Sequence, residues 1–225
     1  MWNIFERKKE YIMYQSVKRV IDFIGAVVLL ILAGIPMIIV AICIKLEDGG
    51  PVFFKQQRIG KNLKPFYIYK FRSMRVDRKE LQSNLTHDQM VTKVGKIIRA
   101  TSLDELPQLF NILKGEMAFI GPRPWIREYY SWFTKEQKRR SDVLPGISGL
   151  AQVKGRNGID IVEKINYDLE YVNTISFKTD IKIVFETIKT VFSREEAEIS
   201  EVGIKEELSE LKEMKQLRKA KMTAE

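Results

Sequence analysis

An uninterrupted apolar run near the start is the strongest pattern in the chain. It extends from Phe23 to Ile44, reads FIGAVVLLILAGIPMIIVAICI and contains 22 residues without a charge. A helix of this length rises about 33 Å, which is enough for the hydrocarbon core of a bilayer. The run therefore predicts a membrane segment. A cleaved signal peptide is the alternative, but no small-residue cleavage motif lies before the charged residues that follow the run.

Basic residues flank this run on both sides. Lys18 and Arg19 precede it, and Lys45 and Lys55 follow it. Because basic flanks favour the cytoplasm, both ends of the segment favour the same side of the membrane. Pro36 lies inside the run, where it removes a backbone N–H and predicts a bend. The residues leave two topologies open: a helix that enters, bends and returns, and a kinked helix that crosses the membrane.

Other patterns lie outside the apolar run. Residues 51–74 mix aromatic and basic side chains, which is typical of a strand or extended segment at an interface. Further on, apolar residues recur at helical spacing with lysines beside them: Ile181, Val184, Phe185, Ile188, Val191 and Phe192, with Lys178, Lys182 and Lys189. This stripe predicts a helix that either packs in the core or lies in the membrane interface. Residues 193–225, rich in Glu, Lys and Met, predict a charged helical tail, a candidate for self-association.

The composition narrows the chemistry. With 225 residues, 45% of them hydrophobic, the chain can bury a core of its own. Its net charge of +9 indicates an anionic partner: nucleic acid, anionic lipid or a phosphorylated substrate. The apolar run and the interleaved acidic residues count against nucleic acid. A single cysteine, Cys43, and a single histidine, His87, exclude an intrachain disulfide and a Cys/His zinc site, so any catalysis would depend on carboxylates and cations.

Two adjacent carboxylates are the candidates for that chemistry. Asp104 and Glu105 follow Ser102, and the spacing of Ser102 and Glu105 matches a capping box that opens a helix. Pro107 is compatible only with an early helical turn. Since a helix N-terminus also attracts anions, the same place suits a metal-bound phosphate beside a carboxylate. Spacing alone leaves a structural cap and a catalytic pair both open.

Two glycine-initiated turns each present an arginine. Gly121 opens the turn that carries Arg123, and Gly155 opens the turn that carries Arg156. A guanidinium on a stiff turn suits phosphate oxygens, and a salt bridge to a nearby acid is the other interpretation of each. With the carboxylates, these arginines fit an enzyme of phosphoryl chemistry at a membrane, and a non-catalytic basic membrane protein that binds anionic lipid or partners is the alternative.

Five blocks of the sequence resemble, in the same order, the small monotopic polyprenyl-phosphate phosphoglycosyl transferases, the bacterial sugar transferase family. They are Lys18 to Ile44 (beginning KRVIDFIG), Gly50 to Met74 (GPVFFKQQRIGKNLKPFYIYKFRSM), Lys93 to Pro124 (KVGKIIRATSLDELPQLFNILKGEMAFIGPRP), Pro145 to Asn157 (PGISGLAQVKGRN) and Tyr167 to Ile188 (YDLEYVNTISFKTDIKIVFETI). They cover nearly everything before Ser193, and five ordered blocks are far more specific than any one motif. The charged tail matches no block.

The resemblance implies an α/β, mostly helical, membrane-associated fold with amphipathic interfacial helices. Residues 1–47 would hold a re-entrant helix-break-helix that turns at Pro36, and residues 48–192 the catalytic domain. Both ends of the hairpin would face the cytoplasm at the bacterial inner membrane, in agreement with the two basic flanks. Relatives often carry Ser before this proline, whereas Ile35 offers no hydroxyl here, so a shallower bend is expected.

The resemblance also implies an activity. The chain would move a sugar-1-phosphate from a UDP-sugar to polyprenyl phosphate, release UMP, and so begin assembly of a surface glycan such as capsule. Asp104 would attack the phosphate next to the sugar, Glu105 would assist the lipid phosphate, and Mg²⁺ beside Asp104 would neutralise charge. Matched positions for phosphate or substrate are Lys70, Arg72, Arg99, Arg123, Arg156 and Asn157. The identity of the sugar is not encoded in these blocks.

Overall fold

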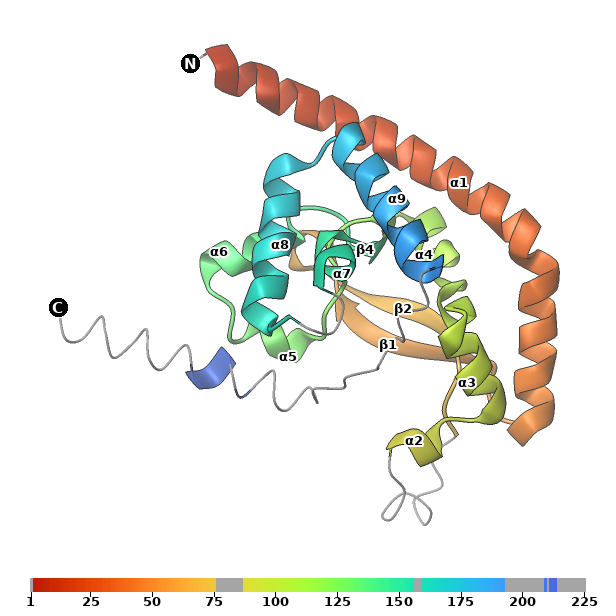
Figure 1. Cartoon of the computed structure of the whole chain (residues 1–225). Coiled ribbons are helices and arrows are strands. Elements are labelled where there is room, and N and C mark those ends of the chain that lie inside the picture. The colour runs from red at the N-terminus through yellow and green to blue at the C-terminus, as the bar shows by residue number, and fades with distance from the viewer. Residues whose placement is uncertain (1, 76–86, 156–158, 193–208, 210, 214–225) are drawn as a thin grey trace. The chain divides into compact units, whose positions relative to one another are not determined.

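The computed structural model describes residues 2–75, 87–155, 159–192, 209 and 211–213, and this part is mostly helical with two two-stranded sheets (Figure 1). The helices are α1 (Trp2–Asp48), α2 (His87–Met90), α3 (Lys93–Ala100), α4 (Gln108–Lys114), α5 (Arg127–Tyr130), α6 (Lys135–Lys138), α7 (Leu150–Gly155), α8 (Ile161–Thr174) and α9 (Phe177–Phe192), with 3-10 helices η1 (Lys61–Leu63), η3 (Leu103–Glu105) and η4 (Arg139–Ser141). The strands are β1 (Phe53–Ile59), β2 (Pro65–Phe71), β3 (Ala118–Ile120) and β4 (Gly146–Ser148). The mostly helical prediction is confirmed.

The chain forms two compact units whose segments alternate along the sequence. The first unit takes Met1–Arg19, Gln57–Phe66 and Glu116–Glu225, and the second takes Val20–Gln56 and Tyr67–Gly115. Helix α1 and the paired strands β1 and β2 therefore contribute residues to both units.

Helix α1 contains the apolar run. Residues Tyr11–Asp48 are long and apolar enough to cross a membrane by length and composition, and the most apolar 18-residue window, of mean hydropathy 3.2, is only 17% buried. The helix continues through Pro36, so the expected helix-break-helix is not seen as an interruption. A proline removes one N–H, and the remaining hydrogen bonds keep a bent helix continuous. Figure 1 shows α1 changing direction in its orange, C-terminal part.

The core of the second unit lies where the end of α1 meets β2 and α3. Met37, Val40 and Ile44 of α1 pack with Phe71 of β2 and Ile98 of α3. These apolar residues recur at i, i+3 and i+7 and so form one stripe of the helix. One stripe of α1 is thus used for packing, whereas most of its large apolar side chains are exposed.

The first unit is built around the parallel pair β3 and β4, in which Ala118 opposes Gly146 and Ile120 opposes Ser148. Gly121 follows β3 at a point of close backbone approach: a Cβ there would lie 2.3 Å from the carbonyl oxygen of Leu144. No larger residue fits without displacing backbone. The start of the turn that carries Arg123 is therefore fixed by packing.

Helix α9 turns a different face inward from the one that its apolar stripe suggests. Ile183 is fully buried and Asp180 nearly so, whereas Ile181, Phe185 and Ile188 are exposed, Phe185 by 67%. The core-packing interpretation of the stripe is therefore wrong for these three residues. The physical reason is the buried carboxylate of Asp180. It accepts hydrogen bonds from Lys18 Nζ at 2.5 Å, Tyr14 Oη at 2.7 Å and Tyr171 Oη at 2.8 Å. A buried carboxylate must keep such partners. These bonds set the rotation of the helix.

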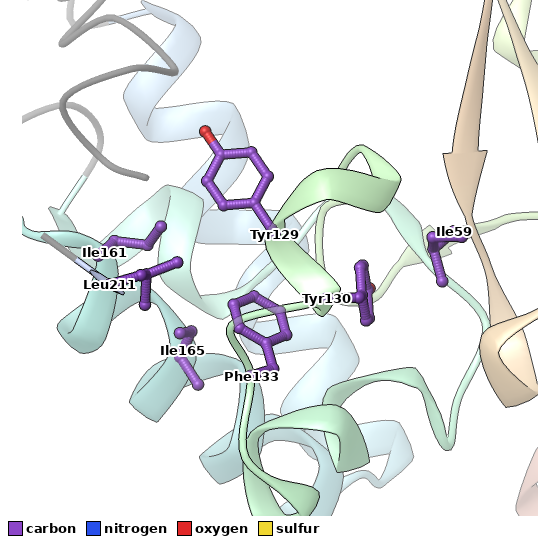
Figure 2. Packing of buried hydrophobic residues seen from close by; sticks show 7 residues of the cluster. All are labelled: Ile59, Tyr129, Tyr130, Phe133, Ile161, Ile165 and Leu211. Carbon is purple, nitrogen blue, oxygen red and sulfur yellow. The ribbon is translucent and has the colours of Figure 1, made fainter. Parts of the chain in front are cut away.

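A second core cluster in the first unit includes one residue of the C-terminal tail (Figure 2). Its members are Ile59, Tyr129, Tyr130, Phe133, Ile161, Ile165 and Leu211. Leu211 is 2% exposed and lies beside Ile161 and Ile165, and the ammonium group of Lys212 is 5.3 Å from the centre of the Trp132 ring. The rest of the predicted tail helix, apart from residues 209 and 213, lies outside the described residues.

Replacing Leu211 by alanine is expected to lower the free energy of unfolding of the first unit by about 2 to 5 kcal/mol, the usual cost of truncating a buried leucine. Glu213→Ala is the matched control, because Glu213 is exposed on the same short segment. Denaturant unfolding of both variants in the same detergent measures the difference. Equal stabilities would show that the tail does not pack against α8.

Candidate active site

The adjacent carboxylates lie in η3, a single 3-10 turn between α3 and α4. The predicted capping box is not formed: Ser102 has a left-handed backbone with φ of 56°, and its side chain makes no capping hydrogen bond. A capping serine needs an extended backbone to reach the N–H groups of the first turn. The residue that precedes α4 is Pro107, so the placement of Asp104 and Glu105 in the first turn of that helix is wrong.

The left-handed Ser102 is itself informative. A non-glycine residue with positive φ stores strain, and such residues cluster at functional sites. Here the turn directs the chain into the carboxylate pair, which begins two residues later.

Lys70 holds the two carboxylates together. Its Nζ donates to Glu105 Oε1 at 2.6 Å and lies 3.9 Å from Asp104 Oδ2. The three side chains are 21%, 20% and 13% exposed for Lys70, Glu105 and Asp104, respectively. Two neighbouring carboxylates repel each other, and a cation within this distance favours their ionised forms. The structure thus brings together three residues that the sequence assigned to the site.

The strand that carries Lys70 is tied to the helix after the pair by Asn111. This fully buried amide of α4 accepts a hydrogen bond from the Tyr69 N–H at 3.1 Å and donates to the Tyr67 carbonyl at 2.7 Å. Buried amides with satisfied hydrogen bonds on both sides rigidify their surroundings. Asn111 was not singled out from the sequence, because an asparagine inside a helical pattern carries no signal of its partners. It fixes β2 against α4, and hence Lys70 near η3.

Arg72 and Arg99, both predicted to hold phosphate, have protein partners in the second unit. Arg72 forms a bidentate ion pair with Asp48 and also donates to the carbonyls of Pro51 and Met74. Arg99 Nε donates to Ser73 Oγ at 2.8 Å. In this arrangement Arg72 joins the end of α1 to β2, and a phosphate role for either arginine stays a prediction.

In the first unit, Arg123 is exposed on the turn after β3. The sequence did not single out a second arginine, Arg58 at the end of β1. It is close enough to Arg123 for the two charges to interact. Burial, together with the nearby charge of Arg123, lowers the pKa of Arg58 to about 10, so Arg58 stays protonated near neutral pH. Paired guanidinium groups suit phosphate oxygens. The only sequence signal for Arg58 was its charge among aromatic residues.

Arg156 and Asn157 lie outside the described residues. The elements on either side are described: α7 ends at Gly155, and Asp160 caps α8 by accepting a hydrogen bond from the Glu163 N–H at 2.7 Å.

Among the described residues no group of three or more His, Cys, Asp or Glu side chains is placed to hold a metal ion. That excludes, within this part of the chain, the all-protein cages typical of structural zinc. Asp104 and Glu105 nevertheless fit Mg²⁺, which usually takes only one or two carboxylates and completes its shell with water and substrate phosphates. Their oxygen-only donor set suits this hard cation.

The second unit thus holds two adjacent carboxylates bridged by a lysine, and it also contains the apolar part of α1. Comparison with known proteins defines the class further: residues 13–194 match the bacterial sugar transferase family, and the chain belongs to that family.

Several curated relatives share 40 to 44% sequence identity with the chain. The chain is 44% identical over 188 residues to the galactosyl transferase CpsE of Streptococcus agalactiae serotype III, which covers 77% of the chain and 42% of the relative. It is 42% identical over 179 residues to the uncharacterized sugar transferase EpsL of Bacillus subtilis, covering 79% and 88%. It is 40% identical over 190 residues to the UDP-glucose:undecaprenyl-phosphate glucose-1-phosphate transferase of Caulobacter vibrioides, covering 80% and 71%. The chain thus spans less than half the length of some relatives and most of the length of others.

Proposed function

We propose that this chain transfers a sugar-1-phosphate from a UDP-sugar to polyprenyl phosphate and releases UMP, as the first step in assembling a bacterial surface glycan. The observation that carries the proposal is the Lys70 bridge to two adjacent carboxylates. The names of family relatives supply the substrate class, because they specify undecaprenyl phosphate with glucose or N-acetylgalactosamine donors.

The chemistry has two displacements. An oxygen of Asp104 attacks the phosphorus next to the sugar, and the bond to the bridging oxygen breaks with its electron pair leaving on UMP. An oxygen of polyprenyl phosphate then attacks the same phosphorus, and the Asp104 carboxylate leaves. Glu105 assists this second attack by accepting any proton that the lipid phosphate carries. Lys70 lies closer to Glu105 than to Asp104. Asp104 is therefore less tightly paired with the lysine, which supports Asp104 as the nucleophile.

Asp104 would also hold Mg²⁺, which would supply neutralisation of the negative charge on the donor diphosphate. Lys70 adds a fixed positive charge beside the carboxylates. Since phosphoryl transfer depends mainly on positioning and charge stabilisation, Lys70, Arg99 and Arg123 are proposed to orient phosphate oxygens.

The anchoring is proposed to be monotopic, with both ends of the apolar segment at the cytoplasmic face. Basic flanks on both sides, Pro36 within α1 and the change of direction of that helix in Figure 1 support this topology. The exposed apolar residues of α9, with Lys178, Lys182 and Lys189 beside them, support a helix lying in the interface.

Cysteine labelling is expected to place both flanks on one side. In a Cys43→Ser background, Lys9→Cys and Lys64→Cys should both react with a membrane-impermeant maleimide in inverted vesicles and be protected in intact spheroplasts, because both flanks are basic. Both positions are exposed. Opposite accessibility of the two cysteines would establish a crossing helix instead.

The activity is tested by measuring UMP release from a panel of UDP-sugars with purified protein, polyprenyl phosphate and Mg²⁺. The panel should include UDP-glucose, UDP-galactose and UDP-N-acetylgalactosamine, since the relatives' names cover these sugars. At least one donor is expected to give UMP and a lipid-linked sugar. A silent panel from folded protein would contradict the proposal.

A further inference from the structure

A fully buried ion pair lies next to the turn that carries Arg123. Arg140 of η4 donates from Nε and Nη2 to Asp168 Oδ2 of α8, at 2.8 Å and 2.6 Å, and the side chains are 2% and 3% exposed. Burial raises the pKa of Asp168, and the charge of Arg140 opposes that rise. Burying two charges is costly unless their remaining hydrogen-bonding groups are also satisfied.

The other donors of Arg140 are directed at the turn and at its surroundings. Nη2 also donates to the Arg123 carbonyl at 2.6 Å, and Nη1 donates to Tyr130 Oη at 2.8 Å. The guanidinium lies 4.2 Å from the centre of the Trp125 ring, a cation–π distance. One arginine thus contacts the turn at residue 123 and again at residue 125.

The turn is held at both ends as well. Gly121 packs against the Leu144 carbonyl, and the Trp125 carbonyl accepts a hydrogen bond from the Ile59 N–H at 2.9 Å. The second contact joins the turn to the residue after Arg58. Fixing this backbone therefore fixes the starting points of both arginine side chains, Arg58 and Arg123.

We propose that Asp168 and Arg140 are positioning residues that present Arg123 to a phosphate group of the substrate; this rests on the proposed function. Stability alone does not explain the pair, because well-packed apolar residues of similar volume often replace buried ion pairs without loss. An apolar pair cannot supply the several N–H donors of the guanidinium group. The planar guanidinium reaches a carboxylate, a carbonyl and a hydroxyl at once, whereas a lysine is a point charge.

A double-mutant cycle on UMP release tests the proposal. Asp168→Asn and Arg123→Ala are each expected to lower kcat/KM by about 100-fold, the scale expected when a positioned group is displaced by about 1 Å. If Asp168 acts through Arg123, Asp168→Asn should cause little further loss in the Arg123→Ala background. Losses that multiply in the double variant would overturn the positioning role.

Asp180→Asn is the matched control. It breaks the other ion pair described above in the first unit, with Lys18, and the hydrogen-bond partners described above for Asp180, which are Lys18, Tyr14 and Tyr171, lie outside the turn of residues 121–125. It should lower the melting temperature as Asp168→Asn does, but leave kcat/KM unchanged. An Asp168→Asn protein that loses melting temperature yet keeps its kcat/KM would contradict the proposal.

Arg140→Lys keeps the charge and removes the fork, so it serves if Asp168→Asn does not fold. It is expected to lower kcat/KM with a small change in melting temperature, and an unchanged kcat/KM would contradict the proposal. A wild-type protein that releases no UMP would contradict the proposed function itself, which separates the two failures.

Discussion

Asp104→Asn is expected to abolish UMP release from a UDP-sugar, with a loss of about 10⁴-fold or more, a scale typical of removing a nucleophile. The amide has the size of the carboxylate but cannot form the acyl phosphate on which the proposed reaction depends. A UMP-coupled assay with and without polyprenyl phosphate measures the loss. Retained turnover would assign the chemistry to another residue.

Two variants sharpen this test. Asp142→Asn removes an exposed carboxylate of the first unit and should leave turnover unchanged. Glu105→Gln should slow the second displacement and spare the first, so a single equivalent of UMP should still appear when the acceptor is absent. Loss of that first equivalent in Glu105→Gln would contradict the separate roles of the two carboxylates.

Lys70→Met is expected to lower kcat by about 10² to 10³-fold, the range for removing one preorganised electrostatic contact. Without its ammonium group, Asp104 and Glu105 repel each other and the donor diphosphate meets uncompensated negative charge. Lys70→Arg should recover part of the rate, because it restores the charge with a different shape. Steady-state kinetics of UMP release compare the variants.

Lys55→Met is the control for Lys70. Lys55 lies on β1, the strand paired with β2, and its ammonium group is 5.4 Å from the centre of the Tyr69 ring. It has an exposed side chain and should be dispensable for turnover. Equal losses in the two variants would mean that general positive charge, rather than the bridge, supports the rate.

The sequence predicted those parts of the structure that depend on local pattern. The charge-free run lies inside α1, and the mixed aromatic and basic segment forms the paired strands β1 and β2. The family resemblance placed Lys70 and the two carboxylates in one site, and the structure brings them together. These features follow from composition, or from motifs that the family resemblance identifies.

Features set by tertiary contacts were missed. The spacing of Ser102 and Glu105 fits a capping box, but the left-handed backbone of Ser102 removes it. The apolar stripe of α9 left core packing and an interfacial position both open, and only the hydrogen bonds of Asp180 with its partners determine which face of the helix is buried. The sequence pattern shows which residues are apolar. It does not show which carboxylate will be buried beside a cation from a distant part of the chain.

The positioning pair was also beyond prediction from one sequence. Arg140 and Asp168 stand 28 residues apart on different elements, and each residue alone is typical of a solvated surface. Only their burial reveals that they form one unit with the turn of Arg123. Long-range polar contacts of this kind leave no periodic signal.

Intact-protein mass spectrometry can detect the proposed covalent intermediate on Asp104. The wild-type protein is incubated with an active UDP-sugar and Mg²⁺ but no polyprenyl phosphate. One added sugar phosphate per chain is expected, mapped to the peptide that contains Asp104, absent from Asp104→Asn and discharged when polyprenyl phosphate is added. Full turnover with the acceptor present, together with no adduct and no release of UMP in its absence, would contradict it.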